Sequence, residues 1–218
     1  MDILIVDDHM LIRRGLARIL AEDARVRRVD EAGDGPAALR ALRAHPYQAV
    51  LLDIALGDRD GLDLLKTLRA EFPALGVVML SVYPEAQFAV RAIRGGAHAY
   101  LNKGCQPEEV LQALARAANG QMHVTPGVAE LLAQNVRRDD ARAPHELLSN
   151  REFQVLQLLS AGRSVSEIGE QLALSANTIS TYRSRIFDKL QVRSLVELVD
   201  YARRHQLGAP QPPSPPGE

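Results

Sequence analysis

The 218-residue sequence predicts an α/β domain with a parallel sheet, followed by an all-α domain of four helices. Short apolar runs alternate with amphipathic stretches through residues 1–120, which is typical of a sheet covered on both faces by helices. A stretch poor in large apolar residues then separates this part from the rest of the chain. From Leu147 onward the apolar residues recur only at helical spacing.

The first domain is expected to contain a strand and a helix in each of five successive units. Four of the expected strands are continuous apolar runs, and the second is a weaker strand that apolar residues only begin and end. Proline stands at the first turn of several helices, and glycine follows the ends of others, as is usual for helix boundaries. The expected strands are 3–6, 26–29, 49–52, 77–80 and 99–101, and the expected helices are 9–21, 36–44, 61–70, 84–94 and 107–119.

The rest of the chain is divided into a linker at 121–145, a helical domain at 146–207 and a disordered proline-rich tail at 208–218. Residues 126–136 of the linker could form one helix. In the helical domain a serine precedes each helix as its N-cap, and glutamates at positions 152 and 197 predict two capping boxes. The expected helices are 149–161, 164–173, 175–190 and 194–204.

Composition and charge exclude several classes of protein. Cys105 is the only cysteine, so an internal disulfide is impossible, and neither a signal peptide nor an apolar stretch of about 20 residues is present. These features favour a cytoplasmic protein. The formal net charge of −1 gives no sign of nucleic-acid binding, so any such signal must be local, as in the basic segment 175–193.

Polar residues follow four of the predicted strands. Asp7 and Asp8 follow the first strand, and Asp53, Ser81 and Lys103 follow three later ones. Because parallel strands end at the same edge of a sheet, these side chains should converge. Clustered carboxylates repel, and Mg²⁺ would relieve that repulsion, so the pattern favours a magnesium site beside an aspartate that can accept a phosphoryl group. Each residue taken alone has a simpler interpretation, as a helix cap or a solvated lysine.

These residues resemble those of the receiver (CheY-like) domain of two-component signalling, which has a flavodoxin-like (βα)5 fold. Residues 53–61 and 97–104 also resemble that family, although Leu56-Gly57 stands where Met-Pro is usual. The resemblance implies that Asp53 accepts phosphate and that Lys103 pairs with the phosphoryl group. It also implies a switch role for Ser81 and Tyr100, although a strand tyrosine is just as readily a core residue. The implied Mg²⁺ ligands are Asp7, Asp8, Asp53 and the backbone carbonyl of Ala55.

The second domain shows a pattern typical of a helix-turn-helix, with a turn at 172–175 before its third helix. The apolar side of that helix is Ile179, Tyr182, Ile186 and Leu190, which leaves small polar and basic residues facing outward. Such residues can contact base edges and phosphates, although a solvated helix of any bundle would look similar.

Residues 148–156, 164–169 and 177–182 resemble the LuxR-type DNA-binding domain. A receiver joined to this domain is typical of the NarL/FixJ-type response regulator, and the sequence is most similar to the BvgA/EvgA branch. The resemblance implies base contacts by Ser180, Thr181 and Ser184, and phosphate contacts by Arg183, Arg185 and Lys189. It also implies that Leu195, Leu198 and Val199 form a homodimer contact on double-stranded DNA. Asn177 and Thr178 complete the predicted DNA-binding set.

The sequence therefore predicts a response regulator in which a sensor histidine kinase phosphorylates Asp53 and thereby controls DNA binding. One alternative is an enzyme that uses Asp53 as a nucleophile on an external phosphoester, but no second acid or base is evident, and we expect no enzymatic activity. The other is a phosphorylation-independent regulator that uses its first domain for dimerisation or ligand binding. The set of Asp7, Asp8, Asp53 and Lys103 argues against that alternative.

Overall fold

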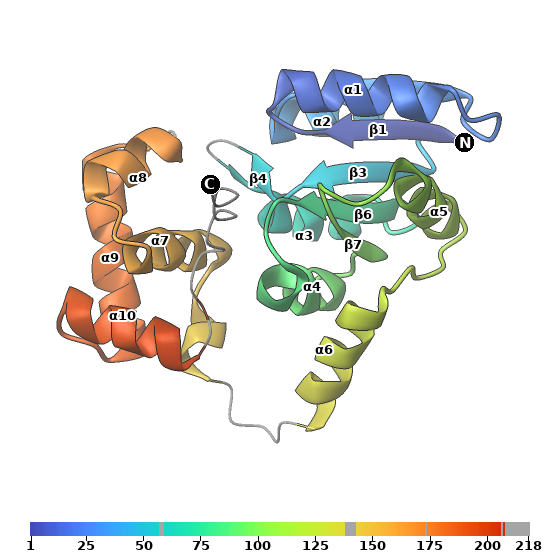
Figure 1. Ribbon diagram of the computed structural model, residues 1–218. Helices are drawn as coiled ribbons and strands as arrows, with labels where there is room; N and C mark the ends of the chain where they lie inside the picture. Colours follow the sequence, from blue (N-terminus) through green and yellow to red (C-terminus); the bar gives the residue numbers. More distant parts are fainter. Residues whose placement is uncertain (57–58, 138–142, 173, 206, 208–218) are drawn as a thin grey trace, which may run out of the picture. The chain divides into compact units, whose positions relative to one another are not determined.

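A computed structural model describes residues 1–56, 59–137, 143–172, 174–205 and 207 of the chain. The chain divides into two compact units, residues 1–138 and 139–218. The predicted combination of a parallel α/β domain and a helical domain is confirmed (Figure 1). The tail at 208–218, for which disorder is predicted, lies outside the described residues.

The first unit is built on a parallel sheet with the strand order β2-β1-β3-β6-β7. All residues of β1, β3 and β6 are buried, as expected of apolar strands that are covered on both faces. The chain order reverses at β1, so the edge of the sheet between β1 and β3 is where a ligand site is expected. The strands are β1 Asp2–Val6, β2 Arg28–Ala32, β3 Ala49–Asp53, β6 Gly76–Ser81 and β7 Ala99–Asn102.

Helices cover both faces of this sheet (Figure 1). Leu20 of α1 and Leu114 of α5 share a core with Ile3, Leu51 and Val78 on one face, and α2, α3 and α4 pack side by side on the other. The helix expected in the linker is present as α6, which packs against α4. The helices are α1 Met10–Ala21, α2 Gly35–Ala44, α3 Gly61–Glu71, α4 Glu85–Arg94, α5 Pro107–Ala118 and α6 Pro126–Arg137.

The structure corrects two details of this domain. The second strand is not 26–29 but β2, Arg28–Ala32, because it is an edge strand whose position follows from pairing with β1 rather than from its own apolar residues. Its charged residues find partners, as Glu31 does with Arg13 at 3.0 Å. A short antiparallel hairpin, β4 Ala55–Leu56 and β5 Arg59–Asp60, follows β3 and was not predicted.

The second unit contains a 3₁₀ turn, η1 Pro144–Leu147, and the helices α7 Asn150–Ser160, α8 Val165–Gln171, α9 Ala176–Leu190 and α10 Leu195–Arg204. The capping box at Ser149 is confirmed, and an unpredicted one is present at Ser164. The box predicted at Ser194 is wrong. Its hydroxyl accepts from the Glu197 N–H at 3.2 Å, but the Glu197 carboxylate accepts from the Arg193 N–H at 2.8 Å instead.

Candidate functional site

The carboxyl ends of the central strands bring the predicted acidic residues together. Asp7 follows β1 and Asp53 ends β3, and both are almost completely buried, with 1% and 2% of their surface exposed. Asp8 is exposed, so the cluster opens to solvent on that side. Ligand atoms of Asp7, Asp8, His9 and Asp53 all lie within 4.8 Å of one another. The spacing suits a single metal ion.

Lys103 reaches this cluster from the loop after β7. Its Nζ lies 2.7 Å from Oδ2 of Asp53 and 2.7 Å from Oδ2 of Asp7. Burial raises the pKa of Asp53 to about 6, with Lys103 opposing that shift and Asp7 adding to it. One ammonium therefore does not compensate the charge of the cluster, and a further cation would stabilise it.

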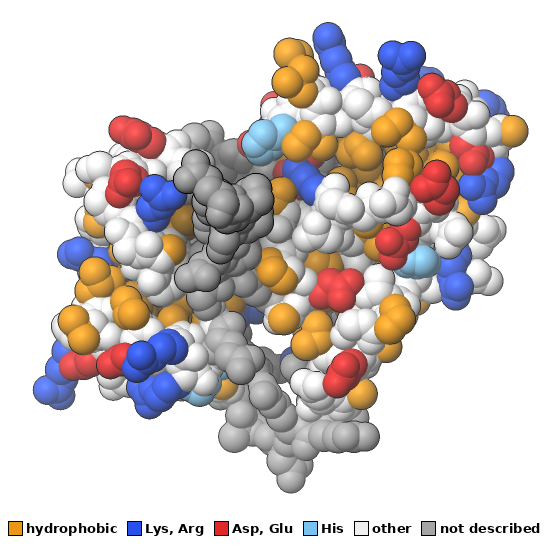
Figure 2. Space-filling view, in the orientation of Figure 1, with side chains coloured by type: hydrophobic (Ala, Val, Ile, Leu, Met, Phe, Trp, Pro, Cys, Tyr) orange, Lys and Arg blue, Asp and Glu red, His pale blue; other side chains and the backbone are white. Residues whose placement is uncertain are grey.

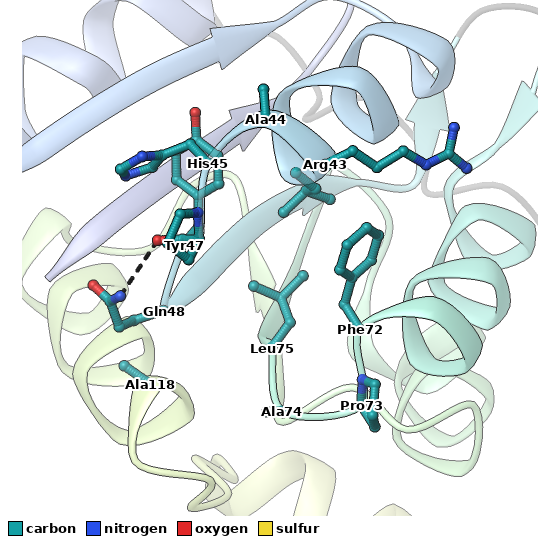
Figure 3. Close-up of a pocket in the computed structure, with 12 residues that line it drawn as sticks. Arg43, Ala44, His45, Tyr47, Gln48, Phe72, Pro73, Ala74, Leu75 and Ala118 are labelled. Atoms are coloured by element: carbon teal, nitrogen blue, oxygen red, sulfur yellow. Dashed lines mark hydrogen bonds between the residues drawn. The ribbon is translucent and has the colours of Figure 1, made fainter.

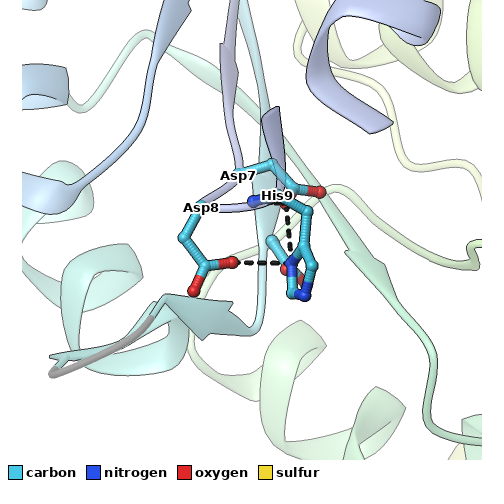
Figure 4. Close-up of side chains that lie close together, drawn as sticks. Asp7, Asp8 and His9 are labelled. Atoms are coloured by element: carbon cyan, nitrogen blue, oxygen red, sulfur yellow. Dashed lines mark hydrogen bonds and ion pairs between the residues drawn. The ribbon is translucent and has the colours of Figure 1, made fainter. Parts of the chain in front are cut away.

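His9 also lies at the acidic cluster, and the sequence reasoning did not identify it. Its Nδ1 lies 2.7 Å from Oδ1 of Asp8 and 3.3 Å from Oδ1 of Asp7 (Figure 4). The only signal in the sequence was its position directly after the aspartate pair. Mg²⁺ prefers oxygen ligands, so the carboxylates, rather than this imidazole, are the fitting donors for that ion.

The backbone around Asp53 is held by the turn into α3. The Gly61 N–H donates to the Ile54 carbonyl at 2.8 Å, and a Cβ on Gly61 would overlap the backbone carbonyl oxygen of Asp53. Only glycine fits this position without moving the Asp53 backbone. The Ala55 backbone N–H hydrogen bonds to the Asp53 carboxylate, which places the predicted ligand residue Ala55 beside the cluster. Gly57 and Asp58 of the same loop lie outside the described residues.

Ser81 lies beside Asp53, because Asp53 is paired in register with Leu80, the residue before Ser81. Ser81 and Tyr100 are connected through the backbone of Tyr83. The Ser81 hydroxyl is buried and accepts from the Tyr83 N–H at 3.0 Å. The Tyr100 hydroxyl donates to the Tyr83 carbonyl at 2.8 Å, and burial raises the pKa of Tyr100. Tyr100 is thus a core residue whose hydroxyl also holds the loop after β6.

The predicted DNA-binding residues are gathered on α9. Its start is set by a tight turn from α8, in which the Leu174 N–H donates to the Gly169 carbonyl at 2.8 Å. A Cβ on Gly169 would lie 2.7 Å from the Leu174 oxygen, so the close approach of the turn to α8 requires glycine there. Thr178 and Ser180 are half-buried, whereas the other outward residues are exposed, namely Asn177, Thr181, Arg183, Ser184 and Arg185.

Two residues of the second unit have different surroundings from those predicted. Lys189 Nζ lies 2.6 Å from the buried carboxylate of Glu152, so its charge is already paired within the domain. Leu198, predicted at a dimer contact, is fully buried in the core. Leu195 and Val199, predicted for the same contact, are exposed, as is Val196, and apolar side chains are visible at the surface over this helix (Figure 2).

A pocket of about 530 Å³ lies at the opposite end of the strands, near the residues that precede β3 and β6. Its lining is mainly apolar and includes Tyr47, Phe72 and Leu75 (Figure 3). None of the residues predicted for a functional site lines this pocket. Among the described residues, no helix has the length and apolar character needed to cross a membrane.

Comparison with known proteins identifies both parts of the chain. Residues 3–115 match the family described as "Response regulator receiver domain", and residues 146–202 match "Bacterial regulatory proteins, luxR family". The response regulator UvrY of Escherichia coli O6:H1 is 34% identical over 207 residues, which cover 94% of this chain and 95% of UvrY. The response regulator GacA of Pseudomonas aeruginosa is 35% identical over 206 residues, which cover 94% of this chain and 96% of GacA.

Solved structures of the protein RcsB show the same architecture. The RcsB–DNA complex aligns with a TM-score of 0.57 at 25% identity and covers 93% of this chain and 98% of that one. A structure of RcsB from Salmonella typhimurium aligns with a TM-score of 0.64 at 26% identity, covering 94% and 97% of the two chains.

Proposed function

Since the chain belongs to the response regulators that join a receiver domain to a LuxR-type DNA-binding domain, we propose that phosphorylation of Asp53 controls its binding to DNA. A transcription regulator is the function that the two domains support. The observation that carries the proposal is the position of Lys103 Nζ, 2.7 Å from both Asp53 and Asp7, in a buried carboxylate cluster.

Each residue of the cluster has a proposed part in phosphoryl transfer. An Asp53 carboxylate oxygen attacks the phosphorus of a phosphohistidine on a sensor histidine kinase; the P–N bond breaks, and an aspartyl phosphate forms. Lys103 is placed to pair with a phosphoryl oxygen. Ser81, which is hydrogen bonded to the loop after β6, is placed to exchange that bond for one to the phosphoryl group.

The carboxylates fit a magnesium ion. Asp7, Asp8 and Asp53, with the Ala55 carbonyl, offer hard oxygen donors. Burial and the neighbouring Asp7 raise the pKa of Asp53, and a bound cation would oppose both effects. When bound, Mg²⁺ would neutralise part of the charge that develops on the phosphoryl group.

The output of the protein is proposed to be a homodimer on double-stranded DNA in the cytoplasm. The exposed polar and basic residues of α9 would enter the major groove, and the exposed apolar residues of α10 would meet those of a second copy. RcsB has been solved in complex with DNA, which supports this arrangement for a chain of the same architecture.

Treatment with acetyl phosphate tests the acceptor site. We expect the intact mass to increase by one phosphoryl group in the presence of Mg²⁺ and not in the presence of a chelator, and we expect Asp53→Asn to stay unmodified. Labelling of Asp53→Asn to the wild-type extent would refute the assignment. Absence of labelling in the wild type would favour a phosphorylation-independent regulator, and sustained turnover of a generic phosphoester would favour an enzyme.

A further inference from the structure

The first turns of α4 and α6 are joined by a side-chain hydrogen bond. The Thr125 hydroxyl donates to Oε1 of Glu85 at 2.6 Å. The same hydroxyl accepts from the Val128 N–H at 3.2 Å, so Thr125 is the N-cap of α6. The carboxylate of Glu85 therefore lies at the positive end of the α6 helix dipole, which strengthens the contact. We define the bond between Glu85 and Thr125 as the α4–α6 clasp.

The absence of a side chain at Gly127 leaves space for the Glu85 carboxylate of the clasp. A Cβ on Gly127 would collide with Oε2 of Glu85. The backbone of Gly127 does not have a positive φ, so backbone conformation does not explain the glycine. The Glu85 carboxylate fills the space where a side chain at position 127 would lie. The glycine therefore makes room for the clasp and is not required by a turn.

The same end of α4 is connected to the phosphoryl site by a short path. Ser81 accepts from the Tyr83 N–H, Tyr100 donates to the Tyr83 carbonyl, and Tyr83 lies two residues before Glu85. The Tyr83 ring also packs on Phe88 of α4, with ring centroids 5.1 Å apart. A movement of Ser81 towards a phosphoryl group would break its bond to Tyr83 and so release the start of α4.

The segment that leads into α6 is anchored to the same domain. The His123 N–H donates to the His98 carbonyl at 2.8 Å, and Val128 is buried with 1% of its surface exposed. Thus α6 packs against α4, and at the first turn of α6 Glu85 contributes a side-chain hydrogen bond from the helix that follows the switch residues. Beyond α6 the chain continues into the DNA-binding unit.

We propose that the α4–α6 clasp transmits the phosphorylation state of Asp53 to α6, and through it to the segment that carries the DNA-binding unit. The proposal rests on the function proposed above. A rearranged loop after β6 displaces the first turn of α4, the Glu85–Thr125 bond is lost or redirected, and the start of α6 loosens from the domain. Glu85 and Thr125 are thus positioning residues, which touch neither the phosphoryl group nor DNA.

The full-length chain and the variants Glu85→Ala, Thr125→Val and Thr125→Ser test this proposal. Hydrogen exchange of the α6 amides is measured with and without acetyl phosphate and Mg²⁺, with the extent of phosphorylation read from the intact mass. We expect phosphorylation to increase α6 exchange at least fivefold in the wild type and in Thr125→Ser, which keeps the hydroxyl. In Glu85→Ala and Thr125→Val the exchange should already be high, and phosphorylation should change it less than twofold.

The matching functional measurement is the ratio of DNA affinities with and without phosphorylation, on a fragment selected from the host genome. We expect this ratio to fall at least fivefold in Glu85→Ala and Thr125→Val and to be retained in Thr125→Ser. If the two disrupting variants are folded by thermal melting and keep the wild-type exchange response and affinity ratio, the clasp has no part in transmission. A wild type that is phosphorylated but shows neither response would overturn the clasp, whereas a wild type that is not phosphorylated would overturn the proposed function itself.

Discussion

The acidic cluster of the receiver and the outward surface of α9 present their proposed functional residues in opposite ways. Asp7, Asp53 and Lys103 contact one another and are largely buried, so their charges interact mainly with one another inside the domain. Thr181 and Arg183 of α9 are exposed. The chemistry of the first region can be deduced from its internal contacts, whereas that of the second depends on a molecule outside the chain. Substitutions should therefore change stability in the first region and affinity in the second.

The largest effect on stability is expected at Gly61, which packs directly against the backbone of Asp53. Gly61→Ala would force the Asp53 backbone to move, and we expect the receiver to lose at least about 3 kcal/mol of unfolding free energy. The matched control is Gly15→Ala in α1, where a Cβ would meet nothing within 4 Å. It should stabilise the helix by about 0.5–1 kcal/mol. Urea denaturation measures both, and equal effects would refute the packing argument.

Asp53→Asn should stabilise the metal-free protein, which would show that the ionised acidic cluster lowers the free energy of unfolding. The pKa of Asp53 is raised to about 6, so the folded state binds a proton more tightly than the unfolded state does. The ionised carboxylate therefore costs stability, and the cost grows from pH 4 to pH 6 and is full at neutral pH. We expect a gain of about 2–3 kcal/mol at pH 7 that disappears near pH 4.

Denaturation of the wild type and Asp53→Asn across this pH range measures the difference. Saturating Mg²⁺ should reduce this difference in unfolding free energy, because the ion binds the ionised carboxylate of the folded wild type. A wild type that is the more stable protein at pH 7 without metal would contradict the account of the cluster.

Lys189 and Arg183 lie on the same helix, and substitutions at the two positions should separate an effect on stability from an effect on DNA affinity. Arg183→Ala should weaken DNA binding by about 5- to 30-fold and leave the unfolding free energy nearly unchanged, because the side chain is exposed. Lys189→Met should instead destabilise the protein by about 1–2 kcal/mol, because it leaves Glu152 buried without its cation. Binding titrations and thermal melts of both variants would show whether these roles are reversed.

The smallest effect concerns the helix caps of the DNA-binding unit. Ser164→Ala removes the acceptor for the Glu167 N–H and one half of a capping box, and should cost about 1 kcal/mol. Ser194→Ala removes only the acceptor for the Glu197 N–H, because the Glu197 carboxylate accepts from the Arg193 N–H and forms no capping box with Ser194. The loss of stability should therefore be smaller than at Ser164. A larger loss at Ser194 than at Ser164 in denaturant titrations would show that the reciprocal bonds do not matter.

Regular elements and the convergence of the acidic residues could be predicted because each follows from local chemistry. Asp7, Asp53, Ser81 and Lys103 each stand at a strand end, and a parallel sheet brings such ends together. The position of β2 could not be predicted, since an edge strand is placed by its neighbour rather than by its own apolar residues. The pairing of Lys189 with Glu152 was also missed, because these residues are 37 positions apart and only the packing of α9 on α7 brings them together.

The most direct test of the account is the affinity of the full-length protein for a selected genomic fragment, before and after treatment with acetyl phosphate and Mg²⁺. We expect treatment to raise the affinity of the wild type at least tenfold and to leave that of Asp53→Asn unchanged. Equal affinities of the treated and untreated wild type, with Asp53 shown by mass to be phosphorylated, would contradict it.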